Sequence, residues 1–198
     1  MMTDELQHSS GRFSKVIICS GHMIDAPDRK TPRFPASKAN AVRAEIARQL
    51  DYWNTQPNDL AICGGASGAD ILFAEECLQR GAKLRLLLAQ KEEEFVRDSV
   101  EPAGSEWMRR FRALREKADV AILPPAADDG RDLSIYERNN IWIIETARRE
   151  AVQASSIHAL LVWDEQPTGD GPGGTSDFGK KVRDLGGAVA IINPTKLP

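Results

Sequence analysis

The chain has 198 residues, of which 41% are hydrophobic and 28% are charged, a composition typical of an ordinary globular protein. Lys and Arg number 26 and Asp and Glu number 29, so the net charge is −3. A groove that neutralises phosphates usually shows as a basic excess, so we expect no duplex nucleic acid as a partner.

Length and the polar start of the chain bound its organisation. We expect a flexible tail over residues 1–13 and a single domain over residues 14–198. No apolar stretch approaches the roughly 20 residues that span a bilayer, and the start lacks the apolar core of a signal peptide. The three cysteines are an odd number in apolar surroundings, which indicates packing as small apolar groups rather than a disulfide framework. We therefore expect a cytoplasmic protein with no membrane partner.

Short apolar runs alternate with longer amphipathic segments along the chain. The apolar runs predict six strands, at residues 15–20, 60–63, 83–89, 120–123, 157–163 and 188–192. Apolar residues at spacings of three and four predict helices at residues 36–53, 70–80, 92–118 (interrupted near 102–104), 134–153 and 175–185. Alternating strands and helices imply right-handed crossovers, and so an α/β fold of three layers around a mostly parallel sheet.

In such a sheet, ligands bind beyond the carboxyl ends of the strands. The strongest signal there is the run Gly64-Gly65-Ala66-Ser67-Gly68-Ala69-Asp70, after the second strand. Its three glycines let backbone approach a ligand closely, and the N–H groups of the following helix start favour an anion. Ser67 offers a hydroxyl, and Asp70 either caps the helix or accepts from a ribose hydroxyl. The alternative is a tight strand–helix turn. The spacing matches neither the dinucleotide fingerprint nor the Walker loop.

A second glycine-rich loop, residues 169–175, follows the fifth strand and opens a helix. Gly173, Gly174 and Thr175 are its candidate nucleotide-binding residues, with Thr175 capping the helix or reaching a phosphate. Alone the loop also fits a flexible connection. Two such loops at one edge of the sheet suit the phosphate and ribose of a nucleotide.

The first strand ends in Ser20-Gly21-His22. Ser20 and Gly21 are candidate binding residues. A catalytic His22 would need a carboxylate to orient it, and Asp25 is too local to establish one. A loop contact is the alternative for His22.

Two further groups of polar residues are candidates. Arg29 and Arg33 suit a phosphate, or form a solvated loop face. Asn139 and Asn140 are poor helix formers, and suit recognition of a base or sugar, or an exposed first helical turn. The sequence lacks the G-x-S-x-G, H-E-x-x-H and C-x-x-C motifs, and the His and Cys spacings offer no metal cluster. We expect no metal and no cofactor.

The run Gly64–Asp70 resembles the Gly-Gly-Ala-Arg-Gly-Ala/Ile-Asp signature of the SLOG superfamily. This superfamily unites the DNA-processing Smf (DprA) proteins with the lonely-guy (LOG) cytokinin-activating proteins. The segment Gly171–Thr175 is similar to its second loop, Pro-Gly-Gly-x-Gly-Thr, and Arg138-Asn139 resembles an Arg-Asn element of some members. Residues 93–107 resemble a variant that is fused to tetratricopeptide repeats in bacterial proteins.

The resemblance implies a Rossmann-like fold that binds nucleotides or nucleotide-derived ligands. Members include phosphoribohydrolases, sensors of nucleotide signals in bacterial conflict systems, and single-strand DNA binders. Two departures matter. Ser67 stands where the family usually has Arg, and the Glu that follows Thr in the hydrolases is not plain here, although Asp177 is a possible substitute.

Three hypotheses follow. The first is a sensor or binding domain for a nucleotide-derived ligand, in bacterial signalling or conflict systems. The second is a hydrolase of the N-glycosidic bond of a nucleoside monophosphate or NAD, with Asp70, Glu137 and Asp177 as candidate catalytic carboxylates. The third is an interaction domain whose partner, including a second copy of the chain, contacts Trp107 or the acidic helix.

Overall fold

The six predicted strands form one parallel sheet. In the computed structural model, which describes residues 13–125, 133–166 and 174–198, the strand order is β4-β3-β2-β1-β5-β6. The strands are β1 Val16–Gly21, β2 Leu60–Cys63, β3 Lys83–Leu88, β4 Asp119–Ile122, β5 Ile157–Val162 and β6 Ala188–Ile192. Each strand end lies within one residue of its predicted place, and all five strand pairs are parallel.

Helices connect the strands as the amphipathic segments predict. The α-helices are α1 Ala39–Tyr52, α2 Ala69–Gln79, α3 Glu92–Ser99, α4 Ser105–Arg115, α5 Ile135–Glu150 and α6 Thr175–Asp184. Short 3-10 turns are Ala36–Lys38, Glu101–Ala103, Ala154–Ser156 and Pro194–Lys196. The predicted interruption of the third helical segment is the turn Glu101–Ala103 followed by Gly104, which has a φ of 99°.

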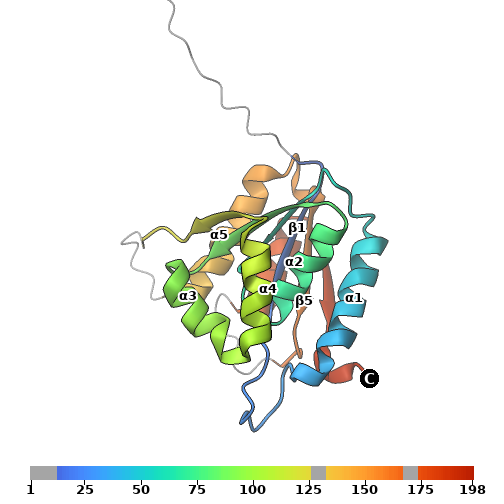
Figure 1. Ribbon diagram of the computed structural model, residues 1–198. Coiled ribbons are helices and arrows are strands. Elements are labelled where there is room, and N and C mark those ends of the chain that lie inside the picture. The colour runs from blue at the N-terminus through green and yellow to red at the C-terminus, as the bar shows by residue number, and fades with distance from the viewer. Residues whose placement is uncertain (1–12, 126–132, 167–173) are drawn as a thin grey trace, which may run out of the picture.

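The helices cover both faces of the sheet, which confirms the α/β fold of three layers. Helices α1 to α4 pack on one face, and α5 and α6 pack on the other (Figure 1). Neighbouring residues of a central strand therefore enter different cores. Ile17 packs with the α1–α4 layer, and Ile18 packs with α5 and α6, both fully buried. This is why the central strands are apolar throughout rather than alternating.

The direction of winding reverses between β1 and β5. The chain steps outward from β1 through β2 and β3 to β4, and then crosses back so that β5 lies beside β1. At such a switch point the connections leave the carboxyl ends of two adjacent strands in opposite directions, and a crevice opens between them. The loops after β1 and β5 therefore flank one crevice.

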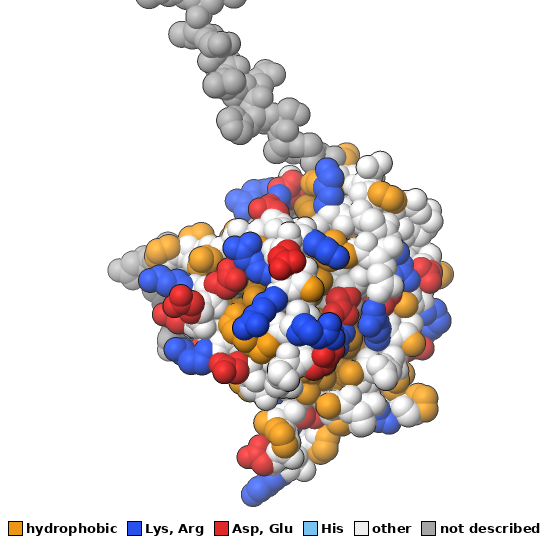
Figure 2. Space-filling model, in the orientation of Figure 1, with side chains coloured by type: hydrophobic (Ala, Val, Ile, Leu, Met, Phe, Trp, Pro, Cys, Tyr) orange, Lys and Arg blue, Asp and Glu red, His pale blue; other side chains and the backbone are white. Residues whose placement is uncertain are grey.

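Charged pairs tie the helices of the α1–α4 layer together. Arg110 of α4 binds both carboxylate oxygens of Glu75 on α2, at 2.7 and 2.5 Å. Arg43 of α1 binds Glu76 of α2 at 2.6 Å. Lys and Arg side chains alternate with Asp and Glu on this face of the molecule (Figure 2).

Several sequence expectations are settled by burial. The three cysteines are free and buried, which confirms that they pack as small apolar groups. Trp107 is only 6% exposed, with the Arg110 guanidinium 4.3 Å from its ring centre, so its ring is not a contact point for a partner, and of the two contact points in the third hypothesis the acidic helix is left. The N–H of Phe13 donates to Glu150 at 2.7 Å, so the tail predicted over residues 1–13 does not include Phe13. In the described part of the chain, no helix is both long and apolar enough to cross a membrane.

Gly68 and Gly104 offer a matched pair of substitutions. Both precede a helix with nearly the same φ, 98° and 99°. A Cβ at Gly68 would lie 2.8 Å from both the His22 carbonyl oxygen and the Ile24 nitrogen, whereas a Cβ at Gly104 meets nothing within 4 Å. We expect Gly104→Ala to cost about 1 kcal/mol of unfolding free energy, from φ strain alone. Gly68→Ala should cost about 1–3 kcal/mol more, because backbone must also move.

Urea denaturation of the two variants measures this difference. Equal destabilisation by the two substitutions would show that the loop after β1 does not press against Gly68.

Candidate functional site

A cleft of about 670 Å³ opens at the carboxyl ends of the strands. Its walls are the loops after β1 and β2, the end of α3 with the following turn, and the N-terminal ends of α5 and α6. Most of the residues that the sequence singles out line this cleft. They are Ser20, Gly21, His22, Arg29, Arg33, Gly64, Ser67, Asp70, Glu137, Asn139, Asn140, Gly174 and Thr175.

Three candidate residues lie elsewhere in the described chain. A side chain at Gly65 would point at Phe111 and Leu86 in the core, and Gly68 packs against residues 22–24. Asp177 on α6 forms an ion pair with Lys181 and is not part of the cleft wall. Gly173 lies outside the described residues.

The backbone N–H groups of the loop after β2 are largely used within the protein. The N–H of Ala66 donates to Oδ2 of Asp70 at 3.2 Å. The N–H of Ser67 donates to the Ser99 carbonyl at 2.9 Å, and the N–H of Ala69 donates to the His22 carbonyl at 3.2 Å. These three groups are therefore not available to an anion, contrary to the reading of this loop as a phosphate cradle. Instead they join the segments after β1, β2 and α3.

Asp70 is a buried carboxylate, 9% exposed, in the first turn of α2. Burial raises the pKa of its carboxyl group to about 7, although the N–H groups of Ala66, Gly65 and Gly64 act to lower it. Cys19 contacts the same carboxylate, and the pKa of its thiol is raised by burial and by the charge of Asp70. Asp70 therefore changes charge near neutral pH, at the wall of the cleft.

The carboxylate of Glu137 caps a helix. Its Oε2 accepts the N–H of Ser134 at 2.6 Å, and Ser134 Oγ accepts the N–H of Glu137 at 3.2 Å. This capping box fixes the start of α5. Glu137 is therefore engaged in a helix cap and Asp177 in an ion pair with Lys181, which leaves Asp70 as the strongest of the three candidate catalytic carboxylates.

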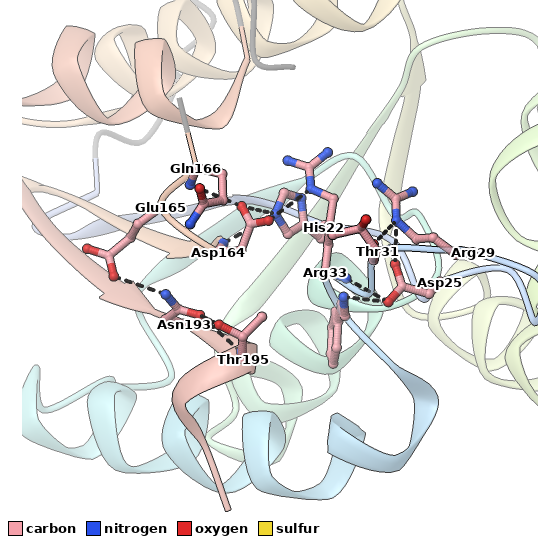
Figure 3. Close-up of polar contacts among 11 residues, drawn as sticks. His22, Asp25, Arg29, Thr31, Arg33, Asp164, Glu165, Gln166, Asn193 and Thr195 are labelled. Atoms are coloured by element: carbon pink, nitrogen blue, oxygen red, sulfur yellow. Dashed lines mark hydrogen bonds and ion pairs between the residues drawn. The ribbon is translucent and has the colours of Figure 1, made fainter. Parts of the chain in front are cut away.

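His22 has the carboxylate partner that the sequence did not reveal. Its Nε2 lies 3.0 Å from Oδ1 of Asp164, which follows β5, and Arg33 Nε donates to the other oxygen of Asp164 at 3.2 Å (Figure 3). Burial acts to raise the pKa of Asp164, but the hydrogen bonds from His22 and the Gln166 N–H, with the charges of His22 and Arg33, outweigh it and lower the pKa. Gly21 at the end of β1 pairs with Val162 at the end of β5, so the segments that follow these two strands meet at the switch point.

Asp25 organises the loop that carries the two arginines. Its Oδ2 accepts the N–H groups of Arg33 and Phe34, both at 2.8 Å, and its Oδ1 lies 3.2 Å from Nε of Arg29. Figure 3 shows this loop beside the His22–Asp164 pair. Asp25 therefore fixes the backbone at Arg33 and the guanidinium of Arg29 at the cleft, instead of orienting His22.

Three buried polar atoms of the cleft wall have no hydrogen-bond partner within the described residues. They are Oγ of Ser67, Oγ of Ser99 and Oδ1 of Asn139, on residues that are 1%, 0% and 6% exposed. Buried polar groups are normally paired, since leaving one unpaired costs about 1–3 kcal/mol. Their grouping around one cleft indicates that a bound molecule completes them. Ser99 was not among the predicted site residues, although it lies within the segment 93–107 that resembles a family variant, because nothing in that segment indicates a ligand contact.

The N-terminus of α6 is the remaining anion site. Gly174 precedes the helix, and no side-chain cap bonds its first turn in the described chain. Both Gly174 and Thr175 line the cleft. The N–H groups of a helix start and the helix dipole favour a negative group here.

Comparisons with known proteins bear on the fold. No family model matches the chain, and neither does any curated protein. Among solved structures, it is similar to DNA processing protein A (DprA) from Streptococcus pneumoniae, with a TM-score of 0.51 and 14% identity over 92% of this chain and 51% of that one. The chain shares the fold of the matched part of that protein.

The chain spans about half the length of that DprA. The chain is also similar to TM1055, a structural genomics target, with a TM-score of 0.39 and 14% identity over 89% of this chain and 91% of that one. At 14% identity, the likeness to DprA shows the fold and says nothing about the ligand.

The raised pKa of Asp70 makes stability depend on pH. Because the folded-state pKa of about 7 exceeds the ordinary 3.8, the native state holds the proton more tightly than the unfolded chain. Stability therefore falls as pH rises from about 4 to about 7, and then levels off. Between pH 5 and 7.5 we expect the wild type to lose about 2 kcal/mol relative to Asp70→Asn, which cannot ionise.

Denaturant unfolding of both proteins at several pH values measures this loss. A free-energy difference that stays constant from pH 5 to 7.5 would contradict the assignment.

Proposed function

We propose that this SLOG chain binds a nucleotide or nucleotide-derived ligand in the cleft, as a sensor or binding domain of bacterial signalling or conflict systems. The observation that carries the proposal is the set of unpartnered buried atoms on Ser67, Ser99 and Asn139 around a cleft of about 670 Å³. That volume lies within the range of small-molecule sites, and a switch point is where open α/β sheets bind ligands.

The two ends of the cleft suit the two ends of a nucleotide. Phosphate would lie at the N-terminus of α6, near Thr175, with Arg29 and Arg33 on the neighbouring loop. Ribose or base would lie over Asp70 and Asn139. With a net charge of −3, phosphate would be held by this helix end and these few arginines rather than by a general basic surface.

The organisation around this site is part of the proposal. Residues 14–198 act as one cytoplasmic domain, without metal or cofactor, and signal through a partner or through self-assembly. Duplex nucleic acid and membrane are not partners.

Thermal unfolding with ATP, AMP, NAD, ADP-ribose and cyclic dinucleotides tests the proposal. A ligand present at 100 times its Kd stabilises the folded protein by about 2.7 kcal/mol. For a chain of this length we expect Tm to rise by about 5–10 °C with at least one of these nucleotides. No shift with any of them at millimolar concentration would contradict nucleotide binding.

A pair of tryptophan variants on α5 tests where the nucleotide binds. Asn140 lines the cleft, whereas Glu145 on the same helix is exposed and lies outside it. We expect Asn140→Trp to fill part of the cleft and abolish the Tm shift. Glu145→Trp should keep the shift, and loss in both variants or in neither would place binding elsewhere.

A second candidate function is hydrolysis of the N-glycosidic bond of a nucleoside monophosphate or NAD. The observation that favours it is Asp70, a carboxyl group on the cleft wall whose pKa is raised to about 7 by burial. A group with a pKa near the working pH is well suited to accept a proton from the attacking water and to stabilise an oxocarbenium-like transition state.

Chromatographic detection of free base released from AMP or NAD tests this candidate. We expect release by the wild type and a loss of at least 100-fold in Asp70→Asn. Asp177→Asn, which removes a carboxylate paired with Lys181, should retain activity. Absence of base release from both substrates would leave the binding function alone.

A further inference from the structure

The orientation of the Asn139 side chain is fixed by its neighbour. Nδ2 of Asn139 donates to the carbonyl oxygen of Leu87 at 2.9 Å. The flipped amide would place two oxygen atoms against each other, so Oδ1 must be the atom on the other side. Oδ1 is an acceptor, it is buried, and it has no partner within the described chain.

An acceptor of this kind restricts what is able to bind. A phosphate or carboxylate at neutral pH offers acceptors and no donor, so it leaves Oδ1 unpaired. A hydroxyl or amino group offers the donor that Oδ1 lacks. Because Asn139 is only 6% exposed, bulk water does not readily supply the missing donor.

The neighbours of Asn139 favour the same type of group. A Cβ at Gly64 would lie 2.9 Å from Oδ2 of Asp70 and 3.4 Å from Nδ2 of Asn139, so these two buried side chains lie close together beside Gly64. Asp70 in its charged form is also an acceptor. This end of the cleft therefore presents acceptors, in contrast to the N–H groups at the start of α6.

We propose that Asn139 determines the specificity of the cleft by requiring a buried hydrogen-bond donor on the ligand, a ribose hydroxyl or an amino group of the base. This inference rests on the proposed nucleotide binding. It also gives the nucleotide an orientation in the cleft: the part that carries the donor lies over Gly64, and the phosphate lies toward Thr175.

Calorimetric titration with AMP and three analogues tests the requirement. AMP is the probe because ATP, NAD and ADP-ribose all contain its adenosine and 5′-phosphate. The analogues are 2′-deoxy-AMP, 3′-deoxy-AMP and purine riboside 5′-monophosphate, which lack the 2′-hydroxyl, the 3′-hydroxyl and the base amino group. We expect one of the three to bind at least tenfold more weakly than AMP, since it leaves the Oδ1 acceptor unpaired. Which analogue is weakened identifies the donor.

The variant Asn139→Leu separates recognition from a structural role. Without Oδ1, the ratio of the affinities for AMP and for the discriminated analogue should fall to about one. A merely structural residue would weaken all four compounds equally and leave that ratio unchanged. Asn193→Leu is the control, because Asn193 is a buried asparagine outside the cleft that accepts from Thr195. It should leave the ratio as in the wild type.

The outcomes separate the donor requirement from the nucleotide binding on which it rests. If no nucleotide in the thermal panel stabilises the wild type, nucleotide binding and the donor requirement both fall. If AMP and all three analogues bind the wild type equally, the donor requirement alone falls. The wild-type series decides this even if Asn139→Leu fails to fold.

Discussion

The hydrogen bonding of one loop determines the shape and chemistry of the cleft. The run Gly64–Asp70 gives its N–H groups to Asp70, to Ser99 and to His22, and so joins the ends of β2, α3 and β1. The bonds to Ser99 and His22 join backbone segments far apart in the chain, and the bond to the Asp70 carboxylate closes the loop on itself. Each satisfies an N–H group that would otherwise need water. The cleft is therefore bounded by a wall that is already assembled before a ligand arrives.

That assembly also decides where charge is accommodated. With the loop after β2 committed to the protein, the start of α6 becomes the place for an anion, and Asp70 and Asn139 form the opposite, acceptor-rich end. The arginines of the loop after β1 are held near the cleft by Asp25, and Arg33 also meets Asp164. A ligand that satisfies both ends has a phosphate at one and donor groups at the other, which is the chemistry of a nucleotide.

The fold was predictable because parallel strands that are buried on both faces appear in the sequence as runs of apolar residues. The ends of the six strands fall within one residue of the predicted positions. The His22–Asp164 contact was not, because its residues are 142 positions apart and meet only through the strand order, which alternation does not specify. The use of the loop amides also depends on Ser99, which has no sequence motif. In contrast, Ser134-x-x-Glu137 was a readable capping box, and would have removed Glu137 from the catalytic candidates.

Asp70 poses the question of why an acid stands at this position. Its structural bond, acceptance of the Ala66 N–H, needs only an oxygen, which an asparagine also supplies. The acid adds the cost of ionising a buried group, and that cost appears as a pKa raised to about 7, although the Cys19 thiol and the backbone N–H groups act to lower the pKa. Folding alone gains nothing from this arrangement above that pH. An ionisable group at position 70 is therefore explained by a role toward a molecule in the cleft, either as an acceptor for a hydroxyl or as a base toward water.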